Sequence, residues 1–424
     1  MIQKVAQYIA NKHLLQSDDH VLVALSGGAD SVALLHLLHS LNYRTTAVHC
    51  NFHLRGIESD RDEQFCRALC LKLGIPLMVQ SFDTTSYARQ HGISIEMAAR
   101  QLRHDWFETQ RTALQAQAIA VAHHRDDQAE TLLLNLVRGS GIRGLAGMKP
   151  RNGAIVRPLL CTSKTDILAY LANNQQDYIT DSTNLQRDAL RNIIRLDVVP
   201  LLQTLNSQAV ENIVRTSEIV RDSLPYYQRG VDITSKELGI QDDYTPLKGL
   251  DATMLHEWLQ GKGFNRQQEQ EMLCSRERDS GKLWISDTHE VLLDRQQLIL
   301  RPKEAETTPI SYTIEFVDAI GETGKDIAYL DADKLDKELL QRTIQPGDRF
   351  VPFGMKGSRL VSDYLTDRKY DRFRKAQQQV LCCGEDIVWV MGERSDNRYR
   401  VTDRTRRIAK ITLNKNVKQQ HKID

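Results

Sequence analysis

The sequence predicts an α/β protein whose N-terminal domain contains a doubly wound parallel sheet. Short apolar strands alternate with helical segments between residues 21 and 173, which is the pattern of a parallel sheet with helices on both faces. Polar clusters follow three of these strands, at residues 26–31, 49–55 and 123–127. Sheets of this kind bind ligands at the carboxyl ends of their strands, so we expect the clusters to form one site.

The individual elements follow from apolar runs, helical periodicity and helix-ending residues such as Gly74. Val21 to Leu25 is a continuous apolar run, which is typical of a strand buried on both faces. In chain order we expect strands at 21–25, 45–50, 77–82, 118–122 and 154–158, and helices at 1–15, 32–41, 58–73, 84–91, 94–115, 124–138, 163–173 and 187–195.

A chain of 424 residues should form more than one domain, because single cores rarely grow beyond about 250–300 residues. We expect a ligand-binding domain over residues 1–200, a mainly helical middle domain over 201–305 and a small α+β domain over 310–424. Helices in the middle domain should end at turns near Leu224-Pro225 and Tyr244-Thr245-Pro246, since proline favours turns.

The composition argues against a membrane-spanning protein and against a disulfide-bonded one. Hydrophobic residues make up 41% of the chain, and no apolar run approaches the roughly 20 residues that span a bilayer. Seven cysteines without a C-x-x-C pair suit a reducing compartment, so we expect a cytoplasmic protein with no membrane partner. The oligomeric state is left open, with a homodimer as one alternative.

The net charge of +1 conceals an asymmetry along the chain. Residues 341–424 carry 19 Lys and Arg against 10 Asp and Glu, whereas residues 1–340 carry 37 against 45. An acidic body with a basic C-terminal part indicates a polyanionic partner, although a solvated charged surface is the alternative.

A candidate phosphate-binding loop follows the first strand. Its two glycines allow a tight turn into a helix whose N-terminal N–H groups favour anions, and its residues are Ser26, Gly27, Gly28, Ala29, Asp30 and Ser31. No Gly-Lys-Ser/Thr ends it, so it is not a Walker-type loop. A carboxylate beside phosphate is repulsive unless a cation lies between them, so Asp30 suggests a bridging Mg²⁺. The alternative is a plain glycine turn with Asp30 at the start of a helix.

Four further clusters carry candidate functional residues. His49 and Asn51 end the second strand and are candidates for nucleotide binding. Arg100 and Arg103 share a helix face with Glu96 and suit a phosphate or RNA backbone, although an exposed salt-bridged stripe is a simpler alternative.

The densest cluster is His123-His124-Arg125-Asp126-Asp127, followed by Glu130. Asp127 and Glu130 lie three residues apart on a helix and would form an anionic pocket for a cation. Farther along lies a set with the pattern DSTN-x6-RN-x-x-R, made of Asp181, Asn184, Arg191, Asn192 and Arg195. Arg191 and Arg195 would share a face suited to phosphate, and an interdomain salt-bridge helix is the alternative.

Together these segments resemble the tRNA(Ile)-lysidine synthetases, a family of PP-loop ATP pyrophosphatases. The resemblance covers nearly the whole chain and is carried, in order, by SGGADS, HCNFHLRG, SIEMAARQLR, AHHRDDQAET, RGSGIRGL, IVRPLL, DSTN with RNIIR, IQPGDRFVPFGMKGSRLVSDYL and VWVMGERSDNRYRVTDRT. It implies an adenine nucleotide α-hydrolase-like fold and an enzyme that uses ATP and Mg²⁺ to adenylate the wobble cytidine of an isoleucine tRNA with a CAU anticodon. Free L-lysine then displaces AMP to form lysidine.

Roles for individual residues follow from this resemblance as hypotheses. Asp127 and Glu130 would anchor the lysine ammonium, and His123 or His124 would transfer its proton. Asp30 would be catalytic through Mg²⁺ held at the phosphates. Residues expected to bind tRNA are Arg100, Arg103, Arg191, Arg195, Arg368, Lys369, Arg372, Arg374 and Lys375.

Other functions share some of these features. A PP-loop tRNA thiolase acting on cytidine or uridine tends to use paired cysteines or an iron–sulfur cluster. A PP-loop GMP or NAD synthetase needs an ammonia source. A non-catalytic RNA-binding protein that senses ATP would release no pyrophosphate. Dependence of the reaction on tRNA and on lysine distinguishes these alternatives.

Overall fold

A computed structural model describes residues 1–180, 190–303 and 309–414 of the chain. It divides the chain into two compact units, Met1–Gln228 and Arg229–Asp424. Within the described ranges, no helix is both long enough and apolar enough to cross a membrane.

The first unit contains the predicted doubly wound sheet. Its six strands lie in the order β3-β2-β1-β4-β6-β5, and every neighbouring pair is parallel except β5 with β6. The strands are β1 (His20–Ala24), β2 (Arg44–Asn51), β3 (Leu77–Ser81), β4 (Ala118–Ala120), β5 (Arg151–Asn152) and β6 (Ile155–Val156). The prediction of a parallel sheet is therefore confirmed, with one antiparallel strand at its edge.

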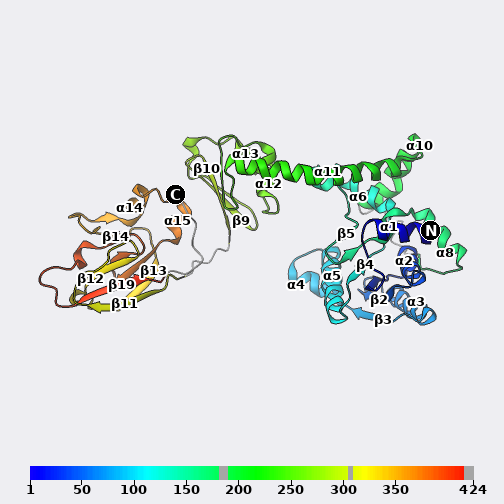
Figure 1. Cartoon of the computed structure of the whole chain (residues 1–424), viewed down its shortest axis with the longest axis horizontal. Helices are drawn as coiled ribbons and strands as arrows, with labels where there is room; N and C mark the ends of the chain where they lie inside the picture. Colours follow the sequence, from blue (N-terminus) through cyan, green and yellow to red (C-terminus); the bar gives the residue numbers. More distant parts are fainter. Residues whose placement is uncertain (181–189, 304–308, 415–424) are drawn as a thin grey trace. The chain divides into compact units, whose positions relative to one another are not determined.

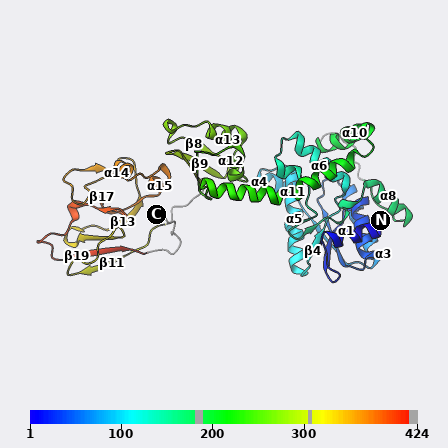
Figure 2. The same ribbon diagram turned by 45° about the horizontal axis from the view of Figure 1, so that its top comes forward.

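Helices cover both faces of this sheet. Val21 and Val23 of β1 pack in a core cluster with side chains of α1, α2, α3 and α8, whereas Leu22 packs on the opposite face with Phe107 of α5. Figure 1 shows α5 on one side of the strands and α2 and α3 on the other, and Figure 2 shows α5 and α3 on opposite sides. The helices of this unit are α1 (Ile2–Asn11), α2 (Ala29–Ser40), α3 (Ile57–Leu73), α4 (Thr84–His91), α5 (Ile95–Ala113), α6 (Arg125–Val137), α7 (Ile142–Leu145), α8 (Lys164–Asn173), α9 (Leu190–Ile193) and α10 (Val199–Leu205).

The predicted turn at Leu224-Pro225 is wrong. Helix α11 (Ala209–Leu238) runs through Pro225 without ending. Proline removes one backbone N–H donor from a helix. Val210, Val214 and Ser217 are buried in the first half of α11, so packing anchors this part of the helix.

The second unit contains antiparallel sheets both within residues 310–424, where strands and helices were expected, and within residues 244–302, which were expected to be mainly helical. Helices α12 (Ala252–Leu259) and α13 (Arg266–Leu273) pack with a four-stranded sheet in the order β7-β10-β9-β8. The later strands form sheets in the orders β11-β19-β12 and β13-β16-β17-β18, with helices α14 (Val361–Asp367) and α15 (Arg372–Gln377). The strands of this unit are β7 (Tyr244–Pro246), β8 (Leu283–Ile285), β9 (His289–Asp294), β10 (Gln297–Pro302), β11 (Tyr312–Val317), β12 (Ile327–Asp331), β13 (Leu339–Thr343), β14 (Arg349–Phe350), β15 (Arg359–Leu360), β16 (Gln379–Cys383), β17 (Asp386–Val390), β18 (Arg394–Ser395) and β19 (Ile408–Leu413).

Candidate active site

The glycine loop between β1 and α2 is held by its own serines. Ser31 Oγ donates a hydrogen bond to the Gly28 carbonyl at 2.9 Å and accepts one from the Ser26 backbone N–H at 3.1 Å. The hydroxyls of Ser26 and Ser31 lie 3.1 Å apart. The first turn of α2 begins within this loop, so its first backbone N–H groups have no partner inside the helix and can bind an anion.

Gly27 is required by the backbone of this loop. Its φ of +89° lies in the region that side chains disfavour, and an added Cβ would lie 3.0 Å from Ile179 Cδ1. The Ile179 backbone N–H donates to the Gly27 carbonyl at 2.9 Å, so the segment after α8 fixes the outer side of the loop.

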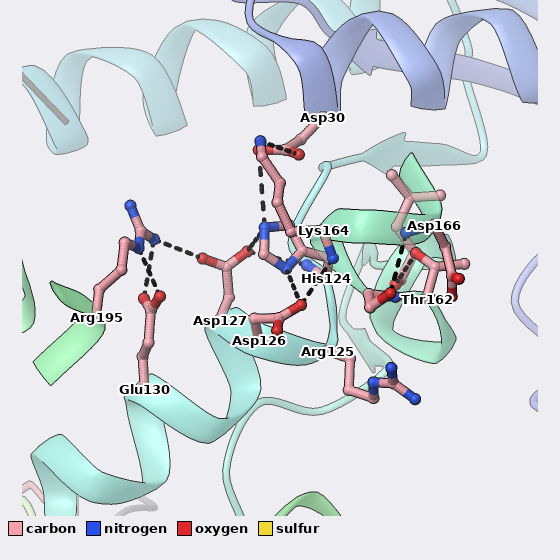
Figure 3. A network of polar contacts seen from close by, with 12 residues as sticks. Asp30, His124, Arg125, Asp126, Asp127, Glu130, Thr162, Lys164, Asp166 and Arg195 are labelled. Atoms are coloured by element: carbon pink, nitrogen blue, oxygen red, sulfur yellow. Dashed lines mark hydrogen bonds and ion pairs between the residues drawn. The ribbon is translucent and has the colours of Figure 1, made fainter. Parts of the chain in front are cut away.

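Asp30, at the start of α2, meets residues from two other helices (Figure 3). Its Oδ1 lies 2.6 Å from Lys164 Nζ, and its Oδ2 lies 3.8 Å from His124 Nε2. Lys164 begins α8, and His124 is the N-cap of α6. The sequence predicted that Asp30 and His124 would share a site, and the structure brings them together.

The two adjacent histidines have opposite electrostatic environments. Burial lowers the pKa of His123 to about 4, and Arg157, Arg191 and Arg103 act in the same direction. Burial alone would also lower the pKa of His124. The carboxylates around it, Asp126, Asp127 and Asp30, nevertheless raise its pKa above the ordinary value. At neutral pH His123 is therefore neutral.

Asp127 and Glu130 do not form an open anionic pocket, because two arginines neutralise them. Arg195 donates from Nε to Glu130 Oε1 at 2.6 Å and from a terminal nitrogen to Asp127 Oδ1 at 3.2 Å. Arg191 makes the same pair of contacts, at 2.9 Å to Glu130 and 3.0 Å to Asp127. The side chain of Glu130 is only 3% exposed, whereas those of the two arginines are about one third exposed.

This four-residue cluster joins two sets that the sequence predicted separately. The acidic pair was expected to anchor lysine, and the basic pair was expected to contact tRNA. In the structure the two pairs form ion pairs with each other. Asp181 and Asn184, from the same motif as the arginines, lie outside the described residues. Both binding roles stay predictions, and each requires that the ion pairs be shared or exchanged.

Comparison with known proteins gives the family. Residues 1–202 match the model of a PP-loop domain, residues 245–303 that of a TilS substrate binding domain and residues 340–411 that of a TilS substrate C-terminal domain. A tRNA(Ile)-lysidine synthase of Bacteroides thetaiotaomicron is 47% identical over 417 residues, which cover 96% of this chain and 98% of the relative.

The chain belongs to the tRNA(Ile)-lysidine synthase family. A relative of the same name from Parabacteroides distasonis is 46% identical over 436 residues, covering 97% of this chain and all of the relative. Among solved structures, the U34-tRNA thiolase NcsA from Methanococcus maripaludis is 18% identical, covers 52% of this chain and 78% of that chain, and gives a TM-score of 0.45. A likeness this low supports no argument about function.

Membership of this PP-loop family implies that the chain uses ATP. Of the other predicted nucleotide residues, His49 lies at the entry to the loop and Asn51 contacts α3. His49 is buried, and its Nδ1 lies 2.8 Å from the Leu25 carbonyl, where β1 enters the loop. The Asn51 amide donates to Glu63 Oε2 at 3.0 Å, so this side chain organises the segment after β2.

Whether Mg²⁺ fits this site depends on which side chains could serve as its ligands. Mg²⁺ is usually held by one or two carboxylates together with substrate phosphates, and Asp30 supplies a carboxylate at the phosphate loop. Across the described ranges, no group of three or more His, Cys, Asp or Glu residues could hold a metal ion by itself. The carboxylate of Asp30 therefore fits an ion that is held jointly with nucleotide phosphates.

Besides Arg191 and Arg195, the other basic residues predicted to bind tRNA are exposed or partly exposed. Arg100 and Arg103 are exposed on α5. In the second unit, Arg368, Lys369, Arg372 and Arg374 are exposed and Lys375 is partly exposed.

Aromatic rings orient part of the second group. The Arg374 guanidinium lies 4.2 Å from the centre of the Tyr370 ring, and that of Arg368 lies 5.1 Å from the Tyr364 ring. Arg368 also pairs with the buried carboxylate of Glu393 at 3.4 Å, so contact of these guanidinium groups with RNA phosphate stays a prediction.

Lys164 is the residue of this site that the sequence did not indicate. It lies at the start of the predicted helix at 163–173, but a single lysine there matches no motif. Its ion pair with Asp30 joins residues 134 positions apart in the chain. Only the packing of α8 beside α2 could reveal it.

Proposed function

We propose that this protein ligates free L-lysine to the wobble cytidine of the isoleucine tRNA with a CAU anticodon. ATP first adenylates the 2-oxygen of the cytidine with release of pyrophosphate, and the ε-amine of lysine then displaces AMP. The observation that carries the proposal is the near-complete match to proteins named tRNA(Ile)-lysidine synthase, which spans the PP-loop domain and both TilS domains.

A tRNA thiolase is not favoured. The seven cysteines are free, and three of them, Cys50, Cys66 and Cys70, have thiols whose pKa burial raises well above the ordinary value. A thiolate is the form that attacks or binds a cluster, so these buried thiols suit packing. None of the cysteines forms a C-x-x-C pair.

ATP binds in this proposal with its phosphates at the loop of residues 26–31. Backbone N–H groups at the start of α2 and the hydroxyls of Ser26 and Ser31 hold phosphate oxygens. When bound with ATP through Asp30, Mg²⁺ supplies positive charge to the phosphates.

Lysine requires an anion for its ammonium and a route for its proton. With a pKa near 10.4, only roughly 0.04% of the amine is neutral at pH 7. Asp127 and Glu130 are the proposed anchor. Because Arg191 and Arg195 already neutralise them, the lysine ammonium enters by displacing or sharing one guanidinium. The released arginine is then available for an RNA phosphate.

The environments of the two histidines suggest how the proton leaves lysine. His123 is neutral at pH 7 and so has a free lone pair, whereas the raised pKa of His124 favours its cationic form. We therefore assign the acceptor role to His123. Arg191 is one of the charges that lower the pKa of His123, so the position of Arg191 affects the strength of His123 as a base.

Product release from purified protein tests the two half-reactions separately. Pyrophosphate release should require the CAU tRNA and ATP but not lysine, and AMP release should require lysine as well. Asp127→Asn should raise the KM for lysine at least tenfold and leave lysine-independent pyrophosphate release within about threefold of wild type. An unchanged KM for lysine in both Asp127→Asn and Glu130→Gln contradicts the anchor assignment.

A further inference from the structure

Lys164 contacts the phosphate loop from outside the loop sequence. Its Nζ lies 2.6 Å from Asp30 Oδ1, and its backbone N–H donates to Asp126 Oδ2 at 2.8 Å. The side chain is 43% exposed, so the pairing with Asp30 does not bury it. Figure 3 shows it reaching toward Asp30 and His124.

The packing of two helices fixes this position. Asp30 on α2 contacts Lys164 on α8, and His36 Nδ1, six residues farther along α2, lies 2.8 Å from the hydroxyl of Tyr170, six residues farther along α8. Two contacts at equal spacing mean that the helices run parallel, with their N-termini at the same end. The positive ends of both helices therefore lie beside the phosphate loop.

Lys164 is one of several positive charges that offset the carboxylates around Asp30, together with His124 and the arginines that pair with Asp127. Asp30, Asp126 and Asp127 all lie close to His124, and three carboxylates beside a triphosphate would repel it. Lys164 supplies a positive charge at Asp30, on a flexible stem with three donors. One donor can keep the contact with Asp30 while another reaches a phosphate oxygen.

We propose that Lys164 binds the β- and γ-phosphates of ATP and stabilises pyrophosphate as it leaves. The cytidine 2-oxygen bonds to the α-phosphorus, the bond from that phosphorus to the oxygen bridging the β-phosphate breaks, and the electron pair stays on pyrophosphate. Lys164 donates hydrogen bonds to the departing oxygens and transfers no proton. This inference rests on the proposed function only in that ATP is the nucleotide cleaved.

The test compares nucleotides with and without the two outer phosphates. Calorimetry on the full chain, without tRNA or lysine, measures the Kd of ATP, of pyrophosphate and of AMP. Lys164→Met should weaken ATP and pyrophosphate about tenfold or more, the loss expected for one charge-assisted hydrogen bond, and should change AMP less than twofold. Lys164→Arg should keep ATP binding within about threefold of wild type.

A matched control removes another lysine that pairs with α8. Lys4 Nζ lies 3.4 Å from Asp166 Oδ2, and Lys4→Met should leave all three affinities unchanged. Equal weakening of ATP and AMP in Lys164→Met would show that Lys164 only holds Asp30, and unchanged ATP affinity would show no contact, so either result overturns the proposal. A wild-type protein that binds ATP through Lys164 but attaches no lysine to tRNA refutes the proposed function alone.

Discussion

The ion pair between Glu130 and Arg195 offers a quantitative test of the charge cluster. Glu130→Gln keeps the shape of the side chain without its charge, and Arg195→Met keeps most of the length without the guanidinium. Breaking a fully buried pair costs about 3–5 kcal/mol, whereas an exposed pair contributes about 0–1 kcal/mol. Glu130 is 3% exposed and Arg195 34% exposed, so the pair lies between these limits. We expect a coupling free energy of about 2 kcal/mol.

The assay is a double-mutant cycle on the free energy of unfolding of the full chain, measured with urea and far-UV circular dichroism. Unchanged m-values show that the substitutions alter stability rather than the compactness of the unfolded state. The matched control cycle uses Lys4→Met and Asp166→Asn, whose side chains are 51% and 45% exposed, and should give less than about 0.5 kcal/mol. A Glu130–Arg195 coupling as small as the control value would refute the cluster as a stabilising element.

Three further predictions concern the loop, the histidine and the basic surface. Gly27→Ala should weaken ATP binding at least tenfold by calorimetry while the fold persists, because its φ is +89° and Ile179 lies beside it; unchanged affinity would mean that the loop tolerates a side chain. NMR titration should find His123 neutral down to about pH 4, and because the unfolded chain binds that proton near pH 6.5, His123 should make stability fall as pH drops from about 6.5 to 4; a pKa near 6.5 would disprove the burial argument. Arg372→Ala and Arg374→Ala should each lower the slope of log K against log salt for tRNA binding by nearly one unit, and an unaltered slope would remove this surface from the interface.

The sheet was predictable because each strand is an apolar run that leads into a periodic helix. Helix α4 was predicted at residues 84–91 and occurs over the same residues. The turn at Pro225 was predicted from a local signal, the proline itself. The amphipathic helical pattern continues on both sides of this proline, and it outweighs the local preference of proline for a turn in α11.

The site was predictable only as separate clusters. Periodicity shows that Asp127 and Glu130 share a face of α6, but it cannot show what faces them. The cations prove to be Arg191 and Arg195, more than 60 residues away in the chain. Pairing at this separation is a property of tertiary packing, and the same holds for Lys164 at Asp30.

The most direct test of the account is transfer of labelled lysine to the isoleucine tRNA with a CAU anticodon. The full chain is incubated with ATP, the tRNA and isotopically labelled L-lysine, and the tRNA is digested and its nucleosides are analysed by mass spectrometry. We predict one lysine per tRNA, found on the wobble cytidine, and none when ATP is omitted. Active, ATP-binding protein that leaves this cytidine unmodified would contradict the central claim.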